Sequence, residues 1–501
     1  MIPRIFLLLM LLLGCAAQAA PNPALVRQLA AEESDDKIAA IRKIALTAEP
    51  EALALLQQLA DGSLKDEKGE EITLNNRVRR ELEGALAVLK LIDPDVKVRY
   101  KAVKEVATNV DAAMAPMLAK ARDRETEPKI RALLSEIHAL ATLKDEDPKI
   151  RLEAAKGLAS SADPNTQAML KAQSEPANET DVEVRRAAFQ SYLAVKDRLT
   201  LAENIGRVFS GLSLGSILLL AALGLAITYG VMGVINMAHG ELLMIGAYAT
   251  YAMQGLFRSY FPDHLDWYLL AAVPVAFFAA AAVGVLLERT VIRWLYGRAL
   301  ETLLATWGLS LMLIQAARVI FGAQNVEVAN PTRMSGGIEI LPSIVLPLNR
   351  IVIVGFALFV LALVWALMNK TRLGMFVRAV TQNRAMAGCV GVPTGRIDTV
   401  AFALGAGIAG LGGVALSQIA NVGPDMGQGY IVDSFMVVVL GGVGQLAGAV
   451  WAALGLGIVT KFIEAWSGAV IAKIVVLVFI IMFIQKRPQG LFALKGRFVE
   501  N

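Results

Sequence analysis

The chain has 501 residues, of which 56% are hydrophobic and 18% are charged, and its formal net charge is +4. This apolar share is well above that of a soluble globular protein and indicates a membrane protein. The small cationic excess gives no reason to expect nucleic acid as a partner, because the basic residues after residue 204 stand in short segments beside apolar runs, where membrane orientation explains them. Most charges fall before residue 204, so two domains are expected.

The first domain is preceded by a segment, residues 1–20, with the pattern of a secretory signal peptide. Arg4 precedes an apolar run, Ile5 to Leu13, that is too short to span a bilayer, and Ala17-Gln18-Ala19 fits a small-x-small cleavage site. A lipoprotein signal is the alternative, since Leu12-Leu13-Gly14-Cys15 resembles a lipoprotein box. Both alternatives predict that the domain after the segment is exported.

Residues 21–204 are rich in Ala, Leu, Lys, Glu and Arg at helical spacing, which predicts an α-helical domain. Within it a short pattern recurs, in which an acidic residue or a proline precedes a Val or Ile, an Arg and an alanine-rich helix. Such repeated helix starts predict stacked helix pairs and resemble HEAT-type repeats. The simplest role for their charged residues is structural, and no residue here marks a ligand site. The copies lie at residues 93–102, 127–132, 147–155 and 181–187.

Residues 205–501 form a succession of apolar runs, each of about the 20 residues that cross the hydrocarbon of a bilayer. They predict a polytopic α-helical membrane domain of eight or nine spans, so the whole chain is expected to be all-α. The run at 431–445 is short and glycines follow it, so either a full crossing or a pair of half-helices fits. The runs are 207–229, 238–257, 267–288, 301–321, 350–368, 397–420, 431–445, 447–465 and 469–485.

The distribution of lysine and arginine orients these spans. The basic segments, around residues 289–298, 370–396 and 486–497, alternate with loops that carry fewer cations. This pattern predicts an N-terminal domain outside the membrane and a cytoplasmic C-terminus, with an odd number of crossings. Glu288 lies near the end of its span, where its side chain is expected to snorkel to the surface.

The run from Leu223 to Tyr251 is interrupted by glycines and polar residues. Such a break is costly within hydrocarbon, because freed backbone groups need partners in protein or in a water-lined cavity. We therefore expect it to line a translocation path or its gate; a structural hydrogen bond is the alternative for the histidine. The orientation places the break at a turn toward the cytoplasm rather than at mid-membrane. Its candidate residues are Asn236, His239, Gly240 and Glu241.

The basic stretch at 369–396 is long enough for an amphipathic helix that lies against the membrane, and an ordinary loop is the alternative. Its small and polar residues would allow a protein groove to hold the helix closely. No G-x-x-x-x-G-K-[ST] motif occurs in the sequence, so any ATP would be bound by another subunit. The candidate residues of this stretch are Arg378, Ala379, Asn383, Ala387, Gly388 and Gly391.

These segments carry a family resemblance. Residues 229–241, which read YGVMGVINMAHGE, resemble the opening of the branched-chain amino acid ABC permeases, and residues 378–392, 405–413 and 439–444 match that family in order. The resemblance covers nearly all of residues 205–501. Within the family, an exported N-terminal extension and the ending Arg487 to Phe492 are similar to permease subunits for urea.

The resemblance implies an inner-membrane permease subunit of an ATP-driven importer, with no cofactor of its own and with a periplasmic N-terminal domain. It implies as partners a second permease subunit, two ATP-binding subunits and a periplasmic solute-binding protein. It also implies that residues 378–391 form the coupling segment that docks on an ATP-binding subunit.

The scarcity of charge within the spans favours a small neutral solute such as urea. Three alternatives remain open: an importer of branched-chain amino acids or short amides, an energy-independent urea or amide channel, and a membrane receptor whose helical domain binds an external partner. An intramembrane enzyme is disfavoured, because the sequence holds no H-E-x-x-H or G-x-S-x-G motif.

Overall fold

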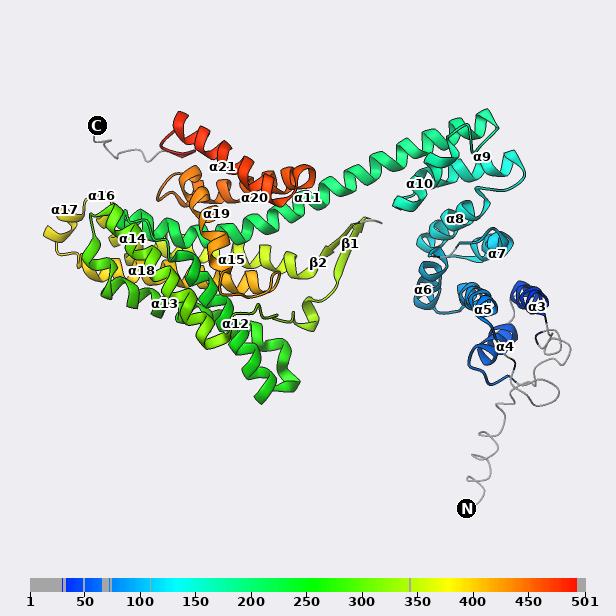
Figure 1. The fold of residues 1–501 in the computed structure, drawn as a ribbon, viewed down its shortest axis with the longest axis horizontal. Coiled ribbons are helices and arrows are strands. Elements are labelled where there is room, and N and C mark those ends of the chain that lie inside the picture. Colours follow the sequence, from blue (N-terminus) through cyan, green and yellow to red (C-terminus); the bar gives the residue numbers. More distant parts are fainter. Residues whose placement is uncertain are drawn as a thin grey trace, which may run out of the picture. The chain divides into compact units, whose positions relative to one another are not determined.

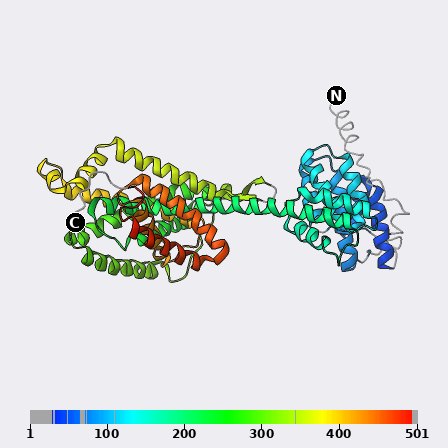
Figure 2. The same ribbon diagram turned by 90° about the horizontal axis from the view of Figure 1, so that it is seen from above.

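The computed structural model of the chain divides into two compact units, Met1–Thr200 and Leu201–Asn501. This division falls four residues before the boundary expected from composition. The expected signal peptide, with Cys15, lies outside the described residues. Each unit is considered by itself below (Figures 1 and 2). The structure describes residues 29, 33–47, 50–64, 72, 74–108, 110–341 and 344–492.

The first unit is a series of short helices, drawn in blue to cyan in Figures 1 and 2. Three hydrophobic clusters follow one another along it, each filled by leucines such as Leu56, Leu118 and Leu158. Successive small cores, rather than one central core, are typical of repeat proteins; the assignment to the HEAT type stays a prediction. The helices are α3 (Ser34–Thr47), α4 (Pro50–Ala60), α5 (Asn76–Leu89), α6 (Val96–Ala107), α7 (Ala115–Arg124), α8 (Pro128–Thr142), α9 (Pro148–Gly157), α10 (Pro164–Gln173) and the start of α11 (Val182–Met232).

The recurring sequence pattern marks helix starts, as predicted. The side chains of Asp95, Asp147 and Asp181 each accept a hydrogen bond from the backbone N–H two residues later, at the starts of α6, α9 and α11. Pro128 and Pro148 occupy the first positions of α8 and α9, where the missing N–H of proline costs nothing and its fixed φ suits a helix. The three aspartates of the pattern therefore cap their helices, and its prolines occupy first helical positions.

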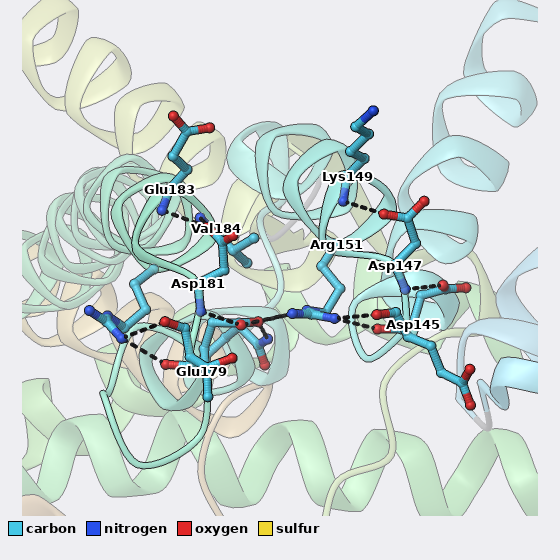
Figure 3. A network of polar contacts seen from close by, with 12 residues as sticks. Asp145, Asp147, Lys149, Arg151, Glu179, Asp181, Glu183 and Val184 are labelled. Atoms are coloured by element: carbon cyan, nitrogen blue, oxygen red, sulfur yellow. Dashed lines mark hydrogen bonds and ion pairs between the residues drawn. The ribbon is translucent and has the colours of Figure 1, made fainter.

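In two of the four copies, the arginine of the pattern ties its helix start to the next copy (Figure 3). Arg151 donates to both carboxylate oxygens of Glu179, at 2.7 and 2.9 Å, and to two carbonyls of the loop before α9. Arg99, two copies earlier, makes the same contacts with Glu125 and its own loop. The hydrogen bond from Arg151 lowers the pKa of Glu179 from 4.5 to about 2. The stabilisation by this pair is therefore present above pH 4.5 and is lost as the pH falls toward 2.

The second unit is a bundle of apolar helices. In the part of the chain that the structure describes, seven helices are long and apolar enough to cross a membrane, and α12 and α19 are not among them. Nine of the helices described in this unit correspond one to one with the nine expected crossings, which agrees with a polytopic α-helical fold. They are the end of α11, then α12 (His239–Tyr260), α13 (Tyr268–Thr290), α14 (Ala299–Phe321), α15 (Leu348–Lys370), α18 (Thr394–Ser417), α19 (Met426–Gly441), α20 (Leu446–Ser467) and α21 (Ala469–Lys486).

The all-α prediction is wrong for one segment between α14 and α15. Strands β1 (Gly337–Leu341) and β2 (Ile344–Pro347) pair antiparallel, with Ile338 opposite Leu346. The β-branched residues of this segment favour an extended backbone. A search for runs of twenty apolar residues cannot detect strands of four and five residues.

Glycines bring α12, α13 and α18 into close contact at the centre of the unit (Figure 1). A Cβ on Gly410 would lie 2.7 Å from the carbonyl oxygen of Ala276, and a Cβ on Gly413 would collide with the carbonyl oxygen of Leu243. Only glycine fits at such crossings, which is how helices approach closely without a hydrophobic driving force in lipid.

The ion pair between repeats generates a stability prediction. We expect Arg151→Ala to destabilise the first unit by about 3 kcal/mol, because it leaves the Glu179 carboxylate buried without its counter-ion. Hydrogen exchange of the amides of residues 145–181 in the full-length protein measures this. The matched control is Arg77→Ala, which removes a pair with Asp35 whose side chains are 71% and 74% exposed and should change stability by less than about 1 kcal/mol. Equal effects of the two substitutions would contradict the prediction.

Candidate translocation site and coupling segment

The break between α11 and α12 reverses the chain inside the second unit. Helix α11 ends at Met232, and Gly233 follows with a φ of +66°, a left-handed conformation that favours glycine. Helix α12 begins at His239, whose Nε2 lies 3.0 Å from the carbonyl oxygen of Ala221. Ala221 precedes Met232 by eleven positions, or about 16 Å of helix. The start of α12 therefore lies far back along α11.

The contacts of Glu241 likewise place the start of α12 far from the helix ends. Its Oε1 accepts a hydrogen bond of 2.8 Å from Ser310 Oγ. Ser310 lies eleven positions after Ala299, the first residue of α14, which again corresponds to about 16 Å of helix. The hydrocarbon core of a bilayer is about 30 Å thick. The expected turn at the cytoplasmic ends of the first two crossings is therefore wrong: the polar residues lie about midway along the helices, because the chain turns back after Gly233.

The backbone freed by this break has partners on α14 and within the break. Thr306 Oγ1 accepts a hydrogen bond of 3.1 Å from the backbone N–H of Met237, and Asn236 Oδ1 accepts one of 3.0 Å from the N–H of Ala238. Asn236 thus satisfies a backbone N–H of the break itself, just before α12 begins. The sequence reasoning missed Thr306 and Ser310; the signal that could have found them is a pair of hydroxyl residues four positions apart, on one face of an apolar helix.

The polar side chains of the break are buried and incompletely bonded. Asn236 is 2% exposed, and His239 and Glu241 are each 1% exposed. Among the described residues, Asn236 Nδ2, His239 Nδ1 and Glu241 Oε2 have no hydrogen-bond partner. A buried polar atom without a partner costs free energy. The cluster therefore has unused capacity to bind water or a polar solute if the surrounding helices part.

Gly240 joins the starts of α12 and α19. A Cβ on Gly240 would collide with the carbonyl oxygen of Gly427, and a Cβ on Gly427 would lie 2.9 Å from the backbone nitrogen of Glu241. Two helix N-termini thus meet beside the polar cluster, and each carries a partial positive charge. All four candidate residues, Asn236, His239, Gly240 and Glu241, lie in this one place.

The stretch expected to be an amphipathic helix forms two short ones, α16 (Arg372–Gln382) and α17 (Arg384–Cys389), at one end of the unit (Figure 1). The side chain of Asn383 separates them and caps α17 by accepting a hydrogen bond of 2.9 Å from the backbone N–H of Met386. The helical interpretation is therefore confirmed over that of an ordinary loop. Asn383 acts here as a cap.

The other candidates in this stretch differ in exposure. Arg378 is exposed, but it donates a hydrogen bond of 2.5 Å to the carbonyl oxygen of Met368 near the end of α15. Gly391 adopts a φ of +86°, which permits the turn into α18. Gly388 is exposed, Ala379 is half-buried and Ala387 is buried.

The sequence reasoning missed the exposed apolar side chains of this stretch. Met375, Met386 and Val390 are 52%, 61% and 73% exposed. Large apolar side chains exposed on an otherwise polar segment are candidates for contact with a partner. The signal for them was in the sequence, as apolar residues on the otherwise polar face of an amphipathic helix.

Glu288 also corrects a prediction. Its side chain does not snorkel: it is fully buried, and its carboxylate accepts hydrogen bonds from Thr399 Oγ1 at 2.8 Å and from the Tyr296 hydroxyl at 3.1 Å. Arg293 Nε lies 3.3 Å from the same carboxylate. Burial, together with the nearby carboxylates of Asp398 and Glu288, raises the pKa of the Tyr296 hydroxyl. The hydroxyl therefore stays protonated and available as a donor.

Comparison with known proteins places these segments in context. The family described as "Branched-chain amino acid transport system / permease component" matches residues 207–485, more than half of the chain. Residues before 207 lie outside this match. No solved structure matches the chain.

Individual relatives agree with the family match. The chain is 29% identical over 291 residues to the high-affinity branched-chain amino acid transport system permease protein BraD of Pseudomonas aeruginosa, covering 57% of this chain and 94% of that protein. It is equally similar, with the same coverage, to the permease protein LivH of Escherichia coli. A shorter match, 30% over 100 residues, covers 31% of the ribose import permease protein RbsC of Escherichia coli and 19% of this chain.

The contact of α12 with α19 generates a second prediction. We expect Gly240→Ala to lower the thermal stability of the protein in detergent by the equivalent of about 1–3 kcal/mol, because the added Cβ overpacks a backbone contact. Gly255→Ala on the same helix is the control; a Cβ there meets nothing within 4 Å, so the melting temperature should stay the same or rise. A Gly240→Ala protein as stable as the control would show that the two helix starts are not in contact.

Proposed function

The chain belongs to the family of branched-chain amino acid transport permeases, and on that premise we propose that it forms the solute path of an ATP-driven importer for urea. In this proposal it acts with a second permease subunit, two ATP-binding subunits and a periplasmic solute-binding protein. It lies in the inner membrane, with the first unit in the periplasm and the C-terminus in the cytoplasm. The permease itself is not an enzyme, since ATP is bound and hydrolysed by the partner subunits.

The observation that carries the proposal is the buried polar break. An interrupted helix at membrane depth is tolerated where it is buried in protein or lines a water-filled cavity, and discontinuous helices of this kind form the substrate sites of many transporters. Here the starts of α12 and α19 meet beside Asn236, His239 and Glu241, whose side chains retain unused hydrogen-bonding atoms. We assign this cluster to the gate of the path, closed in the present conformation.

The arrangement of helix ends supports the sidedness. The contact of Gly230 with Gly444 and that of Gly442 with Gly490 place the end of α11, the α19–α20 turn and the residues after α21 at one end of the unit. The basic residues Lys486 and Arg487 lie at this end. By the positive-inside tendency this end is the cytoplasmic one, and the N-terminal side of α11 is then periplasmic.

The choice of urea follows from the chemistry of the break. Apart from Glu241, the described polar groups of the cluster are the amide of Asn236, the imidazole of His239 and the hydroxyl of Ser310, none of which carries a permanent charge. They suit a small neutral solute that both donates and accepts hydrogen bonds. The names of the relatives favour branched-chain amino acids, which make the second candidate; a zwitterion would need two opposite charges on the path.

Uptake by the reconstituted importer tests the substrate. We expect ATP-dependent accumulation of labelled urea in vesicles that hold all subunits, and none without ATP or without the permease. Uptake of labelled leucine is measured in parallel, and the solute-binding protein is titrated separately for each solute. Accumulation of leucine but not of urea would replace the preferred substrate by the second candidate, and urea flux through the permease alone would favour a channel.

The exposed side chain of Met386 tests the coupling segment. Met386→Glu should lower ATP-driven uptake at least about tenfold, because a charge replaces an apolar contact with the ATP-binding subunit. The control Met386→Leu keeps the apolar side chain and should transport normally. Co-purification of the ATP-binding subunits reports docking directly. Normal uptake by the glutamate variant would remove α17 from the docking surface.

A further inference from the structure

Helix α17 is anchored to α18 by a partly buried ion pair. Arg384, the first residue of α17, places Nη1 at 3.3 Å from Asp398 Oδ1 and donates through Nη2 to Asp398 Oδ2. Asp398 lies in the second turn of α18 and its side chain is fully buried, whereas the side chain of Arg384 is 43% exposed. The pair therefore joins the surface of the coupling segment to the interior of the membrane unit.

The same guanidinium reaches a second buried group. The Arg384 guanidinium carbon lies 5.1 Å from the centre of the Tyr296 ring, within the range of a cation–π contact. The Tyr296 hydroxyl lies 3.1 Å from both Glu288 Oε1 and the sulfur of Met232. Met232 is the last residue of α11 and precedes Gly233, where the chain reverses. One tyrosine thus stands between the coupling segment and the break.

Glu288 closes the network. Thr399, which follows Asp398 on α18, donates a hydrogen bond of 2.8 Å to Glu288 Oε2 on α13. This bond joins α13 and α18 next to the Arg384–Asp398 ion pair. Arg293 lies 3.3 Å from Glu288 Oε1 and donates 3.1 Å to Thr399 Oγ1. Two carboxylates and two guanidinium groups are thereby balanced in charge. We name the set Arg384, Asp398, Tyr296, Glu288 and Met232 the anchor network.

Apolar packing runs parallel to these polar contacts. Met232 and Tyr296 both pack against the hydrophobic cluster that contains Val234, which lies in the break, and Leu242, which lies in the first turn and a half of α12. A displacement of Tyr296 therefore acts on residues on both sides of Gly233.

The energetics of the network favour a positioning role. Buried ion pairs contribute little net stability compared with apolar residues of the same volume, since the desolvation of the charges offsets their attraction. A network held only for stability could be replaced by leucine and phenylalanine. What the ionic contacts add is a defined geometry between α17, α18 and the end of α11.

We propose that the anchor network transmits movement of the docked coupling segment to the α11–α12 break, with Asp398 and Tyr296 as its positioning residues. This inference rests on the proposed function, because it requires an ATP-binding subunit that moves α17. In it, displacement of Arg384 releases Tyr296, which releases Met232 and allows the chain at Gly233 to change its course.

The test uses the complete importer in vesicles and compares ATP hydrolysis with uptake of the solute that the unaltered complex transports, labelled urea or labelled leucine. Tyr296→Phe keeps the ring and removes the hydroxyl that reaches Glu288 and Met232. We expect ATP hydrolysis within about twofold of the unaltered complex and a fall of about fivefold in solute moved per ATP, as for the loss of one charge-assisted hydrogen bond. Tyr260→Phe, at a tyrosine that is 76% exposed at the end of α12, is the matched control.

Asp398→Asn removes the charge that holds Arg384 and should lower the ratio of transport to hydrolysis further than Tyr296→Phe does. The double variant should be little worse than Asp398→Asn alone, because both residues act in one path. An unchanged ratio in Tyr296→Phe overturns the inference. A fall in hydrolysis, uptake and melting temperature together, with the ratio unchanged, also overturns it in favour of a purely structural role. If Asp398→Asn does not fold, Tyr296→Phe alone decides. Absence of ATP-driven uptake in the unaltered complex refutes the proposed function instead.

Discussion

The second unit is built around one constraint, that a backbone broken at membrane depth must find hydrogen-bond partners within the protein. The break after Met232 meets it with the hydroxyl of Thr306, the amide of Asn236 and the contact of His239 with a carbonyl of α11. These partners come from three different segments, so α11, α12 and α14 must pack together for the break to be tolerated. The polar cluster is thus a consequence of how the bundle is held together, and it leaves unused polar atoms at the place where a path would open.

Close packing by glycine makes the arrangement possible and makes it sensitive to movement. The starts of α12 and α19 touch through the backbone at Gly240 and Gly427. Because no side chain lies between these backbones, a movement of one helix acts directly on the other. The anchor network is built from residues of α11, α13, α17 and α18 and of the loop before α14, and it contacts α11 at its last residue, Met232. In this account small movements of α17 alter the break because stiff elements, joined by charged contacts, lie between them.

Much of this could be predicted from the sequence, and the failures have physical causes. Apolar runs located the long helices of the second unit, seven of which are long and apolar enough to cross a membrane among the described residues. The polar interruption located the break. Both signals are local in the sequence. The depth of Glu241 could not be predicted, since it depends on the reversal at Gly233 and on Ser310, which is far away in the sequence. Glu288 was misread for the same reason: its partners Thr399 and Tyr296 belong to other segments. The coupling stretch was found, but not its exposed apolar side chains.

The central claim, that the break opens to water during the transport cycle, is tested most directly by thiol labelling. With Cys389 replaced by serine, Ala238→Cys introduces a thiol at a position that is fully buried. Tyr260→Cys in the same background, at a position that is 76% exposed and lies outside the coupling segment, is the accessible control. A water-soluble maleimide is expected to label position 238 in the complete importer during ATP turnover and not without nucleotide. Labelling at position 260 with none at position 238 in any nucleotide state would contradict the claim.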